Sequence, residues 1–181
     1  MESYSMESHF QTITDQRITF SNEMNNHLDH PWIRPYKEKW SIGETYYHLY
    51  LMVKRIRQLN SVYIPLMTPV ASIRKKKTFK TKSEDVFKAF EQKHKRAMKA
   101  PFLLMPPKEL DKSYTFRNLE QMLESETEKL KKLVDQMDER VAGQIYYPDP
   151  YAHYPNLIQS IHLIAIHEKH HFEITKKYFN L

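Results

Sequence analysis

The chain has 181 residues, a net charge of +6 and 40% hydrophobic residues, which predicts one compact domain over residues 1–181. With no cysteine and only two glycines, the sequence excludes disulfides, cysteine-ligated metal sites and thiol nucleophiles, and it argues against glycine-rich nucleotide-binding loops. It contains neither an apolar run long enough to span a membrane nor a signal-peptide pattern at its start, so we expect a cytoplasmic protein without membrane association.

The first half of the chain carries two helical patterns. Apolar side chains recur every three or four positions from about Phe10 to His30, which predicts a first helix that Pro31 ends. A second helix begins at Ser41-Ile42-Gly43-Glu44, a capping box in which the serine oxygen accepts an early backbone N–H and the glutamate reaches back. We expect this helix to end near Val62.

A long connection over about residues 64–112 follows, with five prolines and one short helix expected over Ser83–Met98. A third helix is predicted from Ser113 to Gly143, and a tyrosine- and proline-rich loop, residues 144–155, leads to a fourth helix over about Asn156–Tyr178. These elements predict an all-α four-helix bundle. The long crossover between the second and third helices allows the bundle to depart from simple up-down order.

Positive charge is concentrated in this connection. Residues 73–100 hold 11 Lys or Arg and 3 acidic residues, whereas the rest of the chain holds 17 basic and 19 acidic residues. Such a segment is either a patch for nucleic acid or another anion, or a solvated, mobile insertion. Phe79 is the single aromatic residue between Arg74 and Asp85, which is weak support for nucleic-acid binding, so we favour the solvated insertion.

The histidines of the second and fourth helices point to a metal. His167 and His171 are four residues apart and so share one face of the fourth helix, on the stripe expected to face the core. Two such imidazoles can hold one zinc or nickel ion at about 2.0–2.1 Å, or they can be core histidines with hydrogen-bonded partners. His48 shares a helix face with Met52 and adds a third inward-pointing imidazole. Three protein ligands leave one coordination position for water or substrate, which is the pattern of a catalytic site.

Four further residues are candidates for supporting roles. His170 adjoins His171, and His153 lies in the tyrosine-rich loop, where it could rim the site. Glu126 is the one charged residue on the apolar stripe of the third helix, so it either orients a ligand histidine or extends its carboxylate to solvent from the edge of the stripe. Glu168 is the fourth candidate.

Glu168 also completes the H-E-x-x-H pattern of zinc metalloproteases, in which the glutamate is the general base. In such enzymes a third ligand lies downstream, and here only Glu173 follows. A nearly all-helical chain also offers no edge strand to align a peptide. The metalloprotease interpretation is therefore a minor alternative.

Two segments resemble the DinB-like superfamily, which includes the bacillithiol transferase-like group. Trp40–Leu49, WSIGETYYHL, is similar to the Trp-Ser/Thr…His-Leu opening of the family's second helix. Ile166–Ile174, IHEKHHFEI, is similar to its closing H-E-x-H-H-x-x-Q-I helix, with Glu173 where glutamine is common.

The resemblance implies a four-helix bundle with one divalent metal on His48, His167 and His171. It also implies a homodimer and, in some members, transfer of a low-molecular-weight thiol to an electrophilic small-molecule substrate. The metal would lower the pKa of a bound thiol or water and so supply a nucleophile near neutral pH. Three imidazoles suit zinc, nickel, copper or iron, of which we expect zinc or nickel.

Three hypotheses for function follow. The leading one is a metal-dependent enzyme of the DinB-like class, either a thiol S-transferase or a hydrolase. The second is a non-catalytic, metal-stabilised bundle that binds nucleic acid or another anionic partner through the basic insertion of residues 64–112. The third is a metal-free bundle with buried histidines.

Overall fold

The computed structural model describes residues 3–95 and 101–181, and every regular element in this part is a helix, with no strand. An isolated antiparallel bridge joins Tyr146 to Asn156. The all-α prediction is therefore confirmed. No helix in the described part combines the length and the apolarity needed to cross a membrane.

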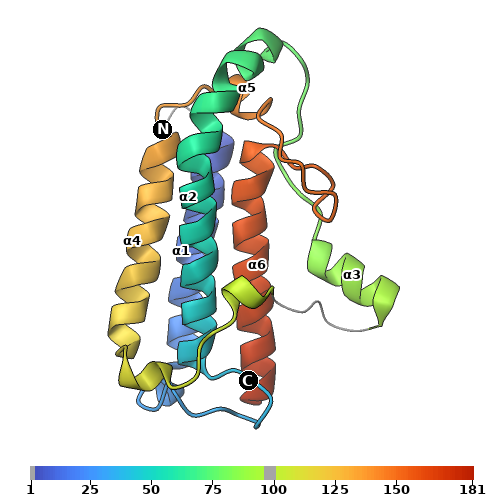
Figure 1. Ribbon diagram of the computed structural model, residues 1–181. Helices are drawn as coiled ribbons and strands as arrows, with labels where there is room; N and C mark the ends of the chain where they lie inside the picture. The colour runs from blue at the N-terminus through green and yellow to red at the C-terminus, as the bar shows by residue number, and fades with distance from the viewer. Residues whose placement is uncertain (1–2, 96–100) are drawn as a thin grey trace.

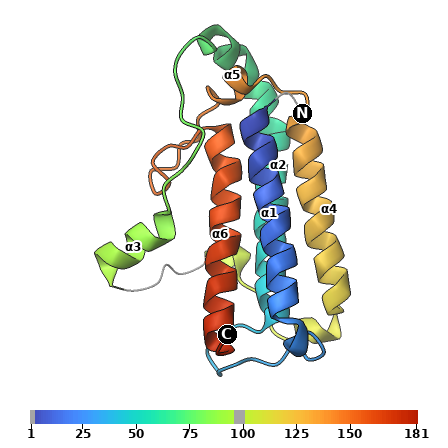
Figure 2. The ribbon, with the colours of Figure 1, turned by 180° about the vertical axis from the view of Figure 1, so that it is seen from behind.

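Four long helices form the bundle (Figure 1): α1 Tyr4–Glu23, α2 Ile42–Arg74, α4 Phe116–Val134 and α6 Leu157–Tyr178. In Figures 1 and 2, α1 and α6 run in one direction while α2 and α4 run in the other. The main packing contacts join α2 to α4 and α1 to α6, so each of these pairs is parallel. Two parallel neighbours need a long return between them, which is why the crossover lies between α2 and α4.

The crossover and the remaining loops hold the short elements: α3 Val86–His94, α5 Glu139–Ala142 and the 3₁₀ helices η1 Asn25–His27, η2 Phe102–Leu104 and η3 Leu110–Lys112. Helix α3 projects from the side of the bundle (Figure 1). The apolar core is built by all four long helices. Near the C-terminal ends of α1 and α6 the rings of Phe20 and Phe172 stack within this core, with centroids 4.2 Å apart.

Helix α2 is longer than the sequence predicts. It passes the expected end at Val62 and continues through Pro65 and Pro69 to Arg74. A proline inside a helix removes a backbone hydrogen bond and costs about 3 kcal/mol. Ile64 and Ala71 are buried in the core, so tertiary packing overrides the local effect of the prolines. The connection therefore begins at residue 75 instead of residue 64.

The bounds of α1 also differ from the prediction. It begins at Tyr4, because the Ser3 hydroxyl accepts a hydrogen bond from the Met6 N–H at 3.2 Å and Met6 is fully buried. It ends at Glu23, and η1 carries the chain to residue 27. Asparagines at residues 25 and 26 favour such a turn over continued α-helix.

The predicted third helix is two helices, α4 and α5. The chain leaves α4 after Val134, and Asp138 starts α5 by accepting a hydrogen bond from the Arg140 N–H at 2.7 Å. Gly143 does follow α5, but its φ of −65° is available to any residue. Its lack of a side chain instead makes room for the Phe79 ring, which a Cβ would meet.

The short helix predicted in the crossover is present, but it begins at a different residue from the one predicted. Asp85, not Ser83, caps α3, since its carboxylate accepts hydrogen bonds from the N–H groups of Phe87 and Lys88. The helix ends at His94, and the predicted end at Met98 lies outside the described residues.

Candidate metal centre

Three imidazoles from two helices meet beside α3 and η2. His48 comes from the second turn of α2, and His167 and His171 come from successive turns of α6. One ring nitrogen of each lies within 4.8 Å of those of the other two, and the Nε2 atoms of His48 and His167 are 3.2 Å apart. The ring centroids are separated by 4.5–5.0 Å. The three residues predicted from spacing therefore form one cluster.

The start of α2 fixes the position of His48. The capping box forms as predicted: the Ser41 hydroxyl accepts from the Glu44 N–H at 3.2 Å, and the Glu44 carboxylate accepts from the Ser41 N–H at 2.8 Å. Arg34 also donates to Glu44, from its Nε at 2.9 Å. Gly43 packs directly against the ring of Trp32, where a Cβ would clash. These contacts anchor the turn that precedes His48.

Hydrogen bonding sets the tautomer of His48. Its Nδ1 lies 2.7 Å from the carbonyl oxygen of Leu104, which can only accept, so Nδ1 carries the proton. The lone pair of its Nε2 then faces the other two imidazoles, as a metal ligand requires. The buried Nδ1 of His167 has no hydrogen-bond partner among the described residues. Protein groups alone thus leave this cluster incompletely satisfied.

Burial keeps the cluster neutral. Loss of hydration lowers the pKa of His48 and lowers that of His167 well below its ordinary value. Burial, reinforced by the charges that His48 and His170 would carry, lowers the pKa of His171 to about 2. Three neutral imidazoles, with one ring nitrogen of each within 4.8 Å of the others, are a donor set that fits a divalent transition metal.

A cavity of about 640 Å³ adjoins the three histidines. The ring of Trp40 stacks on His171, with centroids 5.8 Å apart, and Phe87 from α3 forms part of the wall. The hydroxyls of Thr45 and Thr175, 3.5 Å apart, also line the cavity. The wall of the chamber is thus mainly aromatic and apolar, and its polar groups are the imidazoles, the two threonine hydroxyls and the side chains of Glu38, Lys39 and Tyr178.

Glu168 faces away from the cluster. Its fully buried carboxylate accepts from Arg17 of α1 at 2.9 Å from Nε and 2.5 Å from a terminal nitrogen. Arg17 also donates to Glu124 at 3.0 Å. A carboxylate held in this way ties α6 to α1, and its geometry does not support the metalloprotease interpretation.

Glu126 does not approach the histidines either. Its carboxylate accepts from the Arg57 Nε at 2.6 Å and from the Lys129 Nζ at 2.9 Å. The prediction that it orients a ligand histidine therefore has no support in its contacts. The alternative, a carboxylate that extends to solvent from the edge of the apolar stripe, does not fit either, because Glu126 is only 6% exposed and is paired with Arg57 and Lys129.

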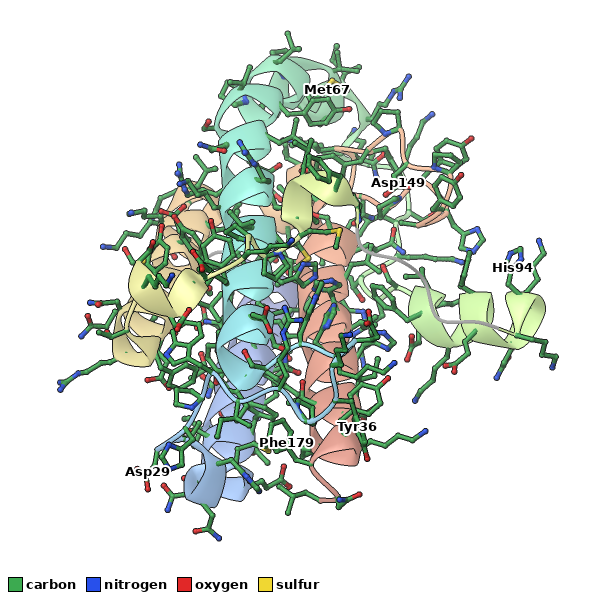
Figure 3. The ribbon with its side chains drawn as sticks, turned by 60° about the horizontal axis from the view of Figure 1, so that its bottom comes forward. Asp29, Tyr36, Met67, His94, Asp149 and Phe179 are labelled. Atoms are coloured by element: carbon green, nitrogen blue, oxygen red, sulfur yellow. The ribbon has the colours of Figure 1, made fainter. Side chains whose placement is uncertain are left out.

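Of the two other candidate histidines, His170 lies at the metal centre and His153 does not. His170 lines the cavity, where its ring stacks on Phe87 with centroids 4.6 Å apart. His153 instead lines a different cleft, beside residues 78–86, so it does not rim the metal centre. His94 lies at the outer end of α3, away from the four long helices (Figure 3).

Three contributors to the site were not recognised from the sequence as part of it: the rings of Trp40 and Phe87 and the carbonyl of Leu104. The position of Trp40 immediately before the capping box and eight residues before His48 was a usable signal. Phe87 and Leu104 lie in the crossover, and no local pattern indicates where a crossover folds back.

Comparisons with known proteins place the chain in a family. No curated protein and no solved structure matches it. A family model described as the DinB superfamily matches residues 7–175, a range that covers nearly the whole chain and contains all three clustered histidines. The chain therefore belongs to the DinB superfamily.

Proposed function

We propose that the protein is a metal-dependent enzyme that activates a small nucleophile, preferably a thiol, for attack on an electrophilic substrate. The observation that carries this proposal is the meeting of three neutral imidazoles at the wall of a cavity large enough for a small molecule. A structural metal site is normally closed by a fourth protein ligand. Among the described residues this group has three.

In this proposal His48, His167 and His171 hold one divalent ion, with zinc or nickel expected. When bound, the ion supplies Lewis acidity that lowers the pKa of a coordinated thiol or water. The Leu104 carbonyl keeps the Nε2 lone pair of His48 directed at the site. Trp40 and Phe87 form an apolar wall that suits an apolar part of the substrate, while Thr45 and Thr175 offer hydrogen bonds to its polar part.

The available bases favour a thiol over water. Glu168 is held by Arg17, so the carboxylate that usually deprotonates water in H-E-x-x-H enzymes is absent from this chamber. Glu38 is the one carboxylate among the lining residues, and it is exposed. A free thiol has a pKa of about 8.5, so it needs much less assistance than water. His170 also lines this chamber, and its imidazole is the group there that can accept that proton.

Metal content measured by mass spectrometry tests the first step. Tag-free protein purified without chelator should carry about one ion per chain, and a His48→Ala/His171→Ala variant should carry none. No metal in either protein, after zinc, nickel and manganese have been offered, would refute the proposal.

The loaded protein should then be assayed with small thiols and chlorinated aromatic electrophiles, and separately with ester and amide substrates. Thiol consumption that requires both metal and His48 supports the transferase. Metal-dependent ester or amide cleavage without thiol would instead identify a hydrolase.

A further inference from the structure

A second cleft lies apart from the metal centre, between residues 78–86 of the crossover and the loop of residues 144–155. Figures 1 and 2 both place these two segments side by side. The cleft has a volume of about 780 Å³, and its lining includes Lys80, Lys82, Tyr146, His153 and Tyr154. It therefore combines positive charge with aromatic rings.

The basic segment is anchored by its backbone. Its carbonyl oxygens accept hydrogen bonds from side chains of the bundle and the loop: Lys77 from Gln144 at 2.9 Å, Lys80 from Asn156 at 2.8 Å, Thr81 from His9 at 2.8 Å and Lys82 from Gln159 at 2.9 Å. The Ser83 N–H donates to Nδ1 of His162 at 2.9 Å. Residues 77–83 thus lie along the bundle in a defined path, unlike the free insertion that the sequence favoured.

This anchoring leaves the charged groups available. Lys80 and Lys82 are exposed, and within residues 3–95 and 101–181 neither forms an ion pair. Arg74, Lys75, Lys76 and Lys77 extend the exposed positive charge directly along the chain. Glu84 is the one acidic residue that lines the cleft. Fixed cations bind an anion with less loss of conformational entropy than mobile ones.

The loop supplies the aromatic surface that the basic segment lacks. Tyr154 is 59% exposed and Tyr146 is 39% exposed, and both line the cleft. His153 and Tyr154 have positive φ values of 58° and 54°, which is costly for residues other than glycine. Asp149 holds this conformation, because its carbonyl accepts from the Tyr154 N–H at 2.8 Å and its carboxylate accepts from the Tyr151 N–H at 2.9 Å.

We propose that this cleft binds single-stranded nucleic acid, with Lys80 and Lys82 at backbone phosphates and the rings of Tyr146 and Tyr154 stacked on bases. Cations beside exposed aromatic rings are the combination used for single strands, whose unpaired bases can reach a stacking surface. The lysines that continue from residue 77 back to residue 75 favour a polymer with several phosphates over a single small anion.

This site is independent of the proposed enzyme chemistry. The first turn of α3 separates the two, since Val86 lines the basic cleft and Phe87 lines the metal cavity. Removal of the metal with a chelator should therefore leave nucleic-acid binding unchanged.

Fluorescence anisotropy with labelled oligothymidine and oligouridine tests the proposal on the full chain. A Lys80→Gln/Lys82→Gln variant should bind about tenfold more weakly and lower the slope of log affinity against log salt by about 1.4. A Lys132→Gln/Lys177→Gln variant removes the same charge from exposed sites on α4 and α6 and should bind within about twofold of the wild-type chain.

The stacking part is tested by Tyr154→Ala, which should weaken binding about tenfold without changing the salt slope. Circular dichroism of each variant confirms that it is folded. Equal losses in the two lysine variants would show general charge attraction and overturn the proposal. The proposal would also be overturned if Tyr154→Ala and Tyr146→Ala both bound the oligonucleotides with wild-type affinity. The same holds if duplex DNA or polyglutamate bound to the wild-type chain as tightly as the single strands do.

Discussion

Helix α6 contributes to two groups of buried or half-buried histidines that are satisfied in different ways. At its N-terminal end His162 lies against His9 of α1, with ring centroids 4.5 Å apart. The Nε2 of His9 donates to the Thr81 carbonyl, and the Nδ1 of His162 accepts from the Ser83 N–H. Further along, His167 and His171 meet His48, and Nδ1 of His167 has no partner among the described residues.

The difference shows what separates a structural histidine from a candidate ligand. Burial lowers the pKa in both groups, so neither burial nor a lowered pKa distinguishes them. The His9–His162 pair uses its ring nitrogens to anchor the crossover to the bundle. In the three-histidine group the ring nitrogens converge on one another beside a cavity, which is an arrangement that a metal would complete.

Glu168 extends the comparison, because it adjoins His167 in sequence but is satisfied entirely by protein. Glu168→Ala would leave Arg17 buried without its main partner and should lower the free energy of unfolding by about 3–5 kcal/mol, with metal content unchanged. Urea unfolding measures this loss. Glu124→Gln is the matched control on the same arginine, and because Glu124 is 52% exposed its loss should stay below about 1 kcal/mol. Stable Glu168→Ala protein with lost metal would instead place Glu168 at the metal centre.

Metal addition should separate the two histidine groups. Zinc at 100 times its Kd should stabilise the wild-type chain by about 2.7 kcal/mol, which raises the Tm by about 5–10 °C. His48→Ala/His171→Ala should show no shift, because two of three ligands are missing. His9→Gln/His162→Gln should show the wild-type shift, although its starting Tm is lower. If the zinc-induced rise in Tm were instead lost in His9→Gln/His162→Gln and kept in His48→Ala/His171→Ala, the metal site would have to be assigned to His9 and His162.

Tyr147 tests the cost of an unsatisfied polar group that is buried away from the three clustered histidines. Its hydroxyl donates to Oδ1 of the buried Asn60, whose Nδ2 has no partner among the described residues. Tyr147→Phe leaves the whole amide unpaired and should lower the free energy of unfolding by about 1–3 kcal/mol, measured in urea. Tyr63→Phe removes a hydroxyl from a more exposed site and should cost less. If Tyr147→Phe and Tyr63→Phe lowered the free energy of unfolding equally, burial would not determine the cost of an unpaired polar group.

Local pattern was sufficient to predict that the four long helices exist and that the three imidazoles meet, but it was not sufficient for all of the helix bounds. The capping boxes at Ser41 and Asn156 set where α2 and α6 begin, and the i, i+4 spacing set the face that His167 and His171 share. The end of α2 was mispredicted, because Pro65 acts locally whereas Ile64 and Ala71 are held by contacts distant in sequence.

Partners contributed by other elements could not be predicted. Periodicity indicates that Glu126 and Glu168 lie on helix faces, but the arginines that bind them come from α2 and α1. The same holds for Phe87 and for the stacking tyrosines of residues 144–155, which approach their neighbours only once the crossover has closed. A sequence motif fixes the position of a side chain on its helix, and the tertiary fold determines what it contacts.

The smallest effect concerns the pH dependence of the His9–His162 pair. Burial, together with the charges of His9 and Lys82, lowers the pKa of His162 to about 4. The folded state therefore binds fewer protons than the unfolded state between about pH 6.5 and pH 4, so stability should fall as the pH is lowered through this window. Because the His162 side chain is partly exposed, solvent screening limits the loss to about 1 kcal/mol.

His162→Gln should flatten this decline, since glutamine has no proton to gain and can still accept from the Ser83 N–H. Urea unfolding at pH 4, 5, 6 and 7 in the presence of a chelator isolates the effect, because the three clustered histidines then contribute equally to both proteins. His30→Gln, at an exposed site, should retain the wild-type slope. If the His162→Gln and wild-type curves run parallel, His162 does not titrate on unfolding, and the anchoring of Ser83 is insensitive to acid.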